Sequence, residues 1–179
     1  MASTTREAHA SEVPGPPALL TTQHERRLAV AHWLLTAATE RTRTAADWEE
    51  RGLLLLECGT LFSAIRVPAD VVQRAAQSGD PQQVDAHLAV VLDGGPVIVD
   101  PVSQRYYALV PVSTVLRWNV SGTLRLGRGS ALGVPYPDRT ERRHGRPYWS
   151  VPMDSAADLC VPGLVARMVR AGRPRGAVQ

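Results

Sequence analysis

The chain has 179 residues, a formal net charge of +3 and 44% hydrophobic residues, as expected of one soluble globular domain. No stretch approaches the roughly 18 apolar residues of a membrane-spanning helix, and no signal-peptide core is present, so we expect a cytoplasmic protein without a membrane partner. The basic residues are all arginine, so a P-loop lysine is excluded. The two cysteines lie far apart and no metal-binding spacing occurs, so we expect no disulfide, metal or cofactor.

The N-terminal part of the chain predicts a leader followed by two helices. Residues 1–20 are small, polar and rich in proline, and we expect them to be disordered. Thr22 and Glu25 have the spacing of a capping box, which predicts the start of an amphipathic helix. A shorter helix that carries Trp48 is expected to end at Gly52.

An apolar run over residues 53–58 predicts a buried strand. Gly59 and Thr60 are typical of a turn, and residues 61–67 are expected to return as the hairpin partner of the first strand.

The middle of the chain predicts two helices and a strand pair. Pro68 suits the first turn of one helix, and a second helix is expected over residues 82–92. Strands over residues 97–99 and 106–110 flank a turn at Asp100, which predicts an antiparallel pair.

The last third alternates short strand and helix patterns. We expect a helix over residues 113–118, strands over 123–126, 131–135 and 148–151, and a final helix capped by Asp154 or Ser155. Residues 172–179 are expected to form a basic tail. Because the pattern lacks strict βαβ alternation, residues 21–171 are predicted to form a single α+β domain. Its sheet is expected to be mixed or antiparallel, with flanking helices.

Three stretches share a hydrophobic pattern and glycine placement with a known family. They are residues 31–34 and 47–48 leading into 54–62, residues 95–100 followed by 106–111, and residues 126–135 followed by 144–149. Together they resemble the bifunctional primase–polymerase-like domain of many short actinobacterial proteins, and the similarity covers most of residues 28–152. The resemblance implies a primase–polymerase-like α+β fold.

The resemblance also implies where an active site would lie. Active members of the family carry an acid-x-acid pair after the first strand and a Ser-x-His further on, and such acids hold divalent metals against a triphosphate. Here Ser63 and Arg66 stand where the acids are wanted. Ser103 is followed by Arg105 instead of a histidine, and Asp100 has no partner acid on its strand. The resemblance therefore implies a catalytically degenerate domain that acts as a binding or regulatory module.

Charge is unevenly distributed along the chain. Residues 1–116 carry a net charge of −4, whereas residues 117–179 carry +7. Six arginines fall within 22 residues, namely Arg125, Arg128, Arg139, Arg142, Arg143 and Arg146. Such a cluster predicts weak, salt-dependent nucleic-acid binding, and the alternative is a solvated arginine surface.

Two further patterns leave alternatives open. Residues 127–130 are either a tight hairpin turn or a glycine-rich cradle for phosphate. The aromatic pairs at 106–107 and 148–149 either stack on bases or contribute to the core.

Other classes of function also remain open. The protein is alternatively a protein–protein adaptor or a homo-oligomer, because the apolar helices and four tryptophans could supply an exposed anchor. A third hypothesis is an enzyme with a non-standard site that uses Cys58, Asp100 or a histidine.

Overall fold

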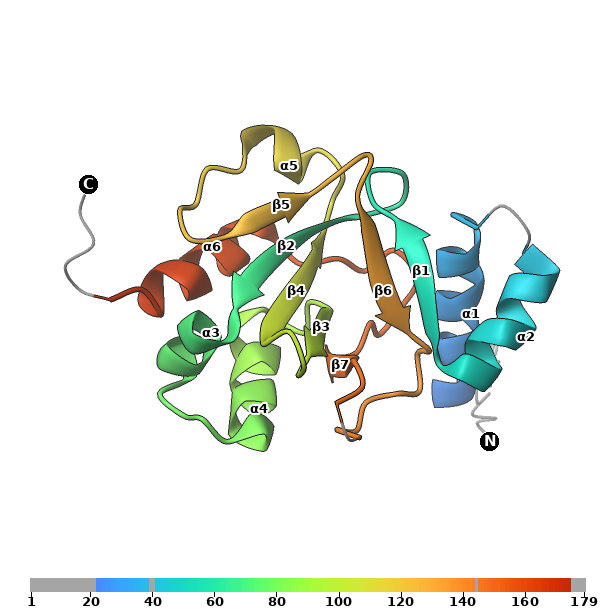
Figure 1. Ribbon diagram of the computed structural model, residues 1–179, viewed down its shortest axis with the longest axis horizontal. Helices are drawn as coiled ribbons and strands as arrows, with labels where there is room; N and C mark the ends of the chain where they lie inside the picture. Colours follow the sequence, from blue (N-terminus) through green and yellow to red (C-terminus); the bar gives the residue numbers. More distant parts are fainter. Residues whose placement is uncertain (1–21, 39–40, 144, 175–179) are drawn as a thin grey trace, which may run out of the picture.

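The computed structural model describes residues 22–38, 41–143 and 145–174, and the expected leader at 1–20 lies outside these residues, as does most of the expected tail. Helices and strands intermix in one α+β domain (Figure 1). The helices are α1 (Gln23–Leu35), α2 (Arg41–Arg51), α3 (Ala69–Ala76), α4 (Pro81–Val91), α5 (Thr114–Arg117) and α6 (Pro162–Ala171). The strands are β1 (Leu53–Glu57), β2 (Ser63–Pro68), β3 (Val97–Asp100), β4 (Arg105–Val110), β5 (Leu124–Leu126), β6 (Ala131–Pro135) and β7 (Tyr148–Val151).

Most of these elements begin and end close to where the sequence places them. The capping box is confirmed, since the Thr22 hydroxyl accepts from the Glu25 amide at 3.2 Å and the Glu25 carboxylate accepts from the Thr22 amide at 2.6 Å. The expected cap of the last helix is wrong. Helix α6 begins at Pro162, where the fixed φ of proline suits the first turn, and Val161 is its N-cap.

The sheet that organises the domain has five antiparallel strands in the order β5-β2-β4-β3-β7. Successive residues of a strand point to opposite faces, so each strand contributes to two separate cores. On β3, for example, Val97 and Val99 belong to one core and Ile98 to the other. Both faces of the central strands are thus buried.

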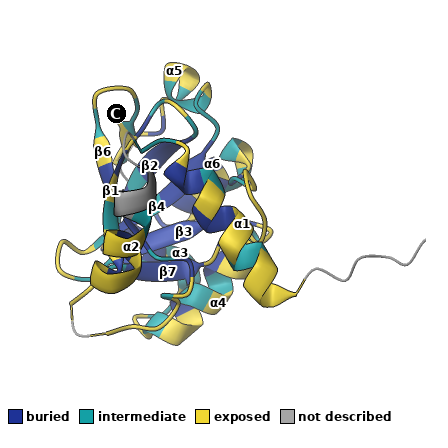
Figure 2. Cartoon of the chain, turned by 90° about the vertical axis from the view of Figure 1, so that its right-hand side faces the viewer, coloured by how far each residue is buried: buried dark blue, intermediate teal, exposed yellow. Residues whose placement is uncertain are grey.

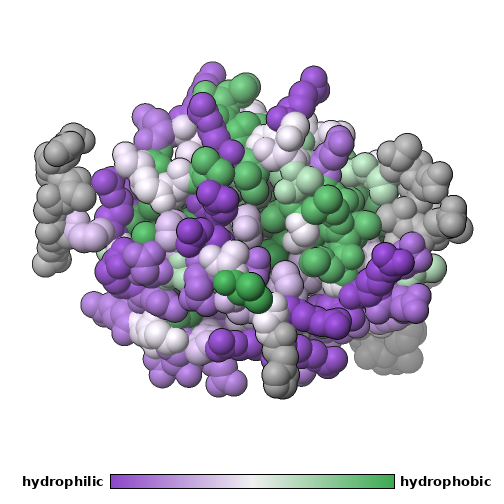
Figure 3. Space-filling model, viewed as in Figure 1, coloured by the Kyte–Doolittle hydropathy of each residue, from purple (hydrophilic) through white to green (hydrophobic). Residues whose placement is uncertain are grey.

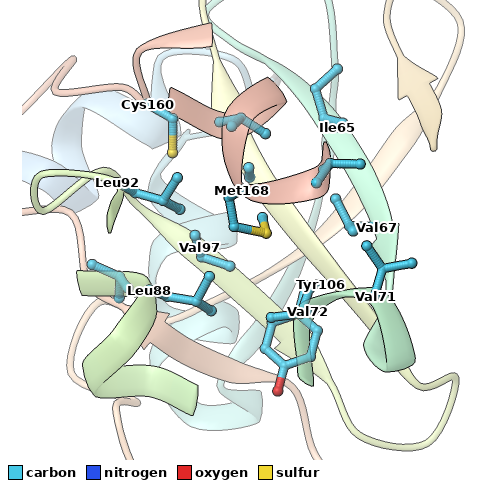
Figure 4. Packing of buried hydrophobic residues seen from close by; sticks show 14 of the residues in the cluster. Ile65, Val67, Val71, Val72, Leu88, Leu92, Val97, Tyr106, Cys160 and Met168 are labelled. Atoms are coloured by element: carbon cyan, nitrogen blue, oxygen red, sulfur yellow. The ribbon is translucent and has the colours of Figure 1, made fainter. Parts of the chain in front are cut away.

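The first core lies between the sheet and helices α3, α4 and α6 (Figure 4). Val72 of α3, Leu88 of α4 and Val165 of α6 are fully buried in it. Tyr106 closes one end of this core, and its hydroxyl points away from the apolar cluster (Figure 4).

The second core lies between the opposite face of the sheet, helices α1 and α2, and a separate two-stranded ribbon formed by β1 and β6. Two tryptophans connect its parts. The Trp48 indole of α2 donates to the Val134 carbonyl of β6 at 2.9 Å, and the Trp149 indole of β7 donates to the Pro135 carbonyl at 3.0 Å. In Figure 2 the central strands are dark blue, whereas the outer sides of α1 and α2 are exposed.

The hairpin expected around Gly59 is wrong. The turn expected at residues 127–130 is present, since the Ser130 amide donates to the Gly127 carbonyl at 3.0 Å, but the strands on either side of it do not pair with each other. Strand β1 pairs with β6, and β2 pairs with β4 and β5. A turn, in which the Gly59 amide donates to the Phe62 carbonyl at 2.7 Å, joins β1 to β2 at a corner of the molecule (Figure 1). Strand β6 runs antiparallel to β1, and β5 runs antiparallel to β2. The amide of Cys58 donates to the Ser130 carbonyl at 2.9 Å within the corner.

Gly59 makes this corner possible. Its φ of +88° lies in the left-handed region that favours glycine, and a Cβ there would stand 2.5 Å from the Arg128 amide nitrogen. Two chain segments therefore cross at a distance that no other residue type permits.

Candidate functional site

The structure does not bring the residues of the implied primase–polymerase site together. Ser63 lies opposite Val110 at one end of the β2–β4 pair, and Arg105 lies opposite Pro68 at the other. Five residues of strand separate these ends by about 17 Å. Arg66 lies between them, and strand alternation directs it to the face opposite that of Ser63.

Asp100 is part of the β3–β4 turn. Its carboxylate accepts from the amides of Val102 and Ser103 at 3.0 and 3.3 Å and from the Ser103 hydroxyl at 2.7 Å. These bonds close an Asx-type turn, which gives both side chains a structural role. Among the described residues, no three histidine, cysteine or acidic side chains gather as a metal site.

A small hollow of about 90 Å³ lies beside this turn. Asp100, Tyr106, Arg142 and Tyr148 are among the residues that line it, so the implied site and the arginine cluster each contribute a residue. Burial raises the pKa of Tyr106 to about 12, so its phenol is neutral at physiological pH. The hollow is therefore a polar recess at the edge of the first core.

Asp85 on α4 was not among the residues that the sequence indicated. Its carboxylate accepts from the buried Ser150 hydroxyl and, at 3.3 Å, from the Tyr148 hydroxyl. Burial raises the pKa of Asp85, while the two hydrogen bonds and Arg142 oppose that shift. The available signal was Ser150, a polar residue within a buried strand, because such a residue requires a hydrogen-bond partner.

The six candidate arginines lie in four places. Arg125 on β5 donates to the carbonyls of Val115 and Trp118 at 3.1 and 3.4 Å, and Arg128 lies in the corner next to Gly59. Arg142 lines the small hollow. The remaining three, Arg139, Arg143 and Arg146, line a different depression together with Glu49, Asp138 and Glu141.

The aromatic pairs of β4 and β7 contribute mainly to the cores. Tyr106 and Tyr148 are buried in the first core and Trp149 in the second, whereas Tyr107 is partly buried. The buried three offer no free ring face on which a base could stack.

Strand β1 is not buried as the sequence predicts. Leu54 and Leu56 face the second core, but Leu53 is 42% exposed and Leu55 is 71% exposed. We call the outward side of β1 and β6 the ribbon face; it consists of Leu53, Leu55, Glu57, Ala131 and Gly133. Figure 3 shows apolar surface over this part of the molecule.

The small residues on β6 keep this face flat. Gly133 lies opposite Leu55, and a Cβ at Gly133 would stand only 3.4 Å from the Leu53 side chain. The leucines therefore lie along the strand pair as a shallow apolar surface.

A depression of about 430 Å³ adjoins the ribbon face at Leu53. This arginine hollow is lined by Glu50, Arg51, Gly52, Leu53, Arg139, Arg146 and Pro147. Its three arginines form no ion pair with any described residue, and two of them, Arg139 and Arg146, also line the depression that contains Glu49, Asp138 and Glu141. Gly52 shapes it, because any side chain at that position would overlap the Arg139 guanidinium.

No protein-family model, curated protein or solved structure matches the chain. The α+β class follows from the structure itself. Within the residues that the structure describes, no helix has the length and apolar content to cross a bilayer.

Proposed function

We propose that this protein is a protein-binding module and that the ribbon face and the arginine hollow form its contact surface. The observation that carries the proposal is the exposure of Leu53 and Leu55 on a strand whose alternate residues, Leu54 and Leu56, pack into the second core. An apolar centre with arginine at its edge is the composition that protein interfaces favour. The proposal assigns no catalytic step to the chain.

The chemistry of the surface describes the partner that it would accept. Leu55 offers apolar area, and Arg51, Arg139 and Arg146 offer guanidinium groups that lack an ion-pair partner among the described residues. A matching partner presents an apolar side chain beside a carboxylate, because guanidinium groups bind carboxylates with two parallel hydrogen bonds. We retain the degenerate primase–polymerase-like domain as our proposal for the origin of the fold.

Site-specific photocrosslinking in the producing cell tests the proposal. A photoreactive amino acid at position 55 should give discrete protein adducts. The same group at position 90 is the matched control, since Val90 is also strongly exposed but lies on α4, away from the ribbon. Adducts at position 55 alone support the proposal; no adducts, or the same adducts at both positions, contradict it.

Nucleic-acid binding remains a second candidate, and the three arginines that line the arginine hollow are the observation that favours it. Fluorescence anisotropy with single- and double-stranded oligonucleotides at two salt concentrations tests this candidate. Binding by the hollow should weaken when Arg139 and Arg146 become alanine, whereas binding at the expected loop should weaken when Arg142 and Arg143 do. Absence of binding at low salt would discard the candidate.

A further inference from the structure

We infer that the partner on this surface is a second copy of the same chain, an inference that rests on the function proposed above. The charge along the ribbon face changes from one end of the strands to the other. The arginine hollow lies at one end beside Leu53, Leu55 lies in the middle, and Glu57 lies at the other end. Glu57 is exposed and forms no ion pair with a described residue.

This order is self-complementary under a two-fold axis. If the axis passes through Leu55 and the two β1 strands run antiparallel, Glu57 of each copy lies over Leu53 of the other. Leu53 borders the arginine hollow, so the carboxylate meets unpaired guanidinium groups. A two-fold interface repeats every contact, so the complex has two such charged contacts around one central leucine pair.

The small size of the surface limits the area that the association can bury. Strand β1 contributes five residues, or about 17 Å of length, and two strands are about 10 Å wide. With the arginine hollow included, this area is still smaller than the roughly 800 Å² per partner of a standard interface. We therefore expect a weak dimer that forms as the concentration rises and that dissociates in high salt, because its charged contacts are exposed.

Sedimentation equilibrium of the full chain over a range of concentrations tests the inference. The wild type should show a monomer–dimer equilibrium. Leu55→Asp should weaken the dimer about tenfold or more, because two leucine contacts become two desolvated carboxylates. Val90→Asp is the matched control and should leave the equilibrium unchanged. Circular dichroism should show that both variants are folded, as expected for exposed positions.

A charge exchange provides the second, independent measurement. Glu57→Arg alone and Arg146→Glu alone should each weaken the dimer several-fold, and the double variant should restore the wild-type constant, because the two residues meet across the axis. A wild type that stays monomeric, a Leu55→Asp dimer of unchanged strength, or a double variant no better than the singles would each overturn the inference. Monomeric wild type with heterologous adducts at position 55 would remove only the second copy and leave the protein-binding function standing.

Discussion

Strands β1 and β3 contain similar apolar runs but occupy different environments. Val97-Ile98-Val99 in β3 lies between two other strands with helices or the ribbon on each side, and all three residues are buried. Leu53 to Leu56 in β1 pairs with one strand only, and its outward leucines are exposed. An apolar run therefore predicts a strand, but the number of layers around that strand decides whether both of its faces are core or one is surface.

The largest expected effect is on stability, and it should differ between truncation of a side chain in β3 and truncation of one in β1. Ile98→Ala removes a side chain that is 1% exposed and should lower the free energy of unfolding by about 2–5 kcal/mol, because a cavity remains. Leu55→Ala should change it by less than about 0.5 kcal/mol at low protein concentration, because this side chain is already in water. Urea denaturation of both variants measures the difference, and equal losses would show that the outward face of β1 is covered in the monomer.

The second prediction concerns the close packing at the corner that joins β1 to the sheet. Gly59→Ala should lower the free energy of unfolding by about 1–3 kcal/mol, because the backbone conformation is strained and the new methyl group meets the Arg128 amide. Gly129→Ala is the matched control, since its φ is also positive but no atom lies within 4 Å of the added Cβ. It should lose about 1 kcal/mol from strain alone. Equal losses for both variants would argue against close packing at the corner.

The buried Asp85 at the sheet should make the free energy of unfolding depend on pH. Burial raises the pKa of Asp85, so the folded state holds its proton more tightly than the unfolded state. The free energy of unfolding should therefore fall as the pH rises from the unfolded value, about 3.9, through the higher folded value. Asp85→Asn should lack this fall. Ser150→Ala should enlarge it, since it removes a hydrogen bond that lowers the pKa. Parallel pH profiles for the wild type and Asp85→Asn would contradict this.

The smallest expected signal is thiol labelling. Burial raises the pKa of Cys58 to about 11 and that of Cys160 to about 12, and both thiols are covered. Single-cysteine variants should therefore react with Ellman's reagent only at the rate at which the protein unfolds. Rapid labelling of the variant that keeps Cys58 would show that the inner side of the ribbon opens independently of the sheet.

Local signals in the sequence predict most of the elements but not their partners. The capping box at Thr22 and the turn at Asp100 depend on neighbouring residues and were correctly placed. The pairing of β1 with β6 depends on residues far apart in the chain, so the short turn at Gly59 suggested the wrong partner.

The candidate surface could be predicted only in part for the same reason. The sequence indicated Arg139 and Arg146, but their association with Leu53 requires the chain to return past Gly52 after about 90 residues. Asp85 and Ser150 similarly meet only when α4 packs on β7. Periodicity within one segment contains no information about either contact.

The long separation between β1 and β6 also determines when the ribbon forms during synthesis. Leu53 lies opposite Pro135, so a nascent chain exposes its leucine run without a partner until β6 has left the ribosome. Closing a loop of about 80 residues costs conformational entropy, and pairings of this kind form slowly and late in folding. The leucines that we propose as a binding surface of the native protein are thus also open to aggregation before the chain is complete.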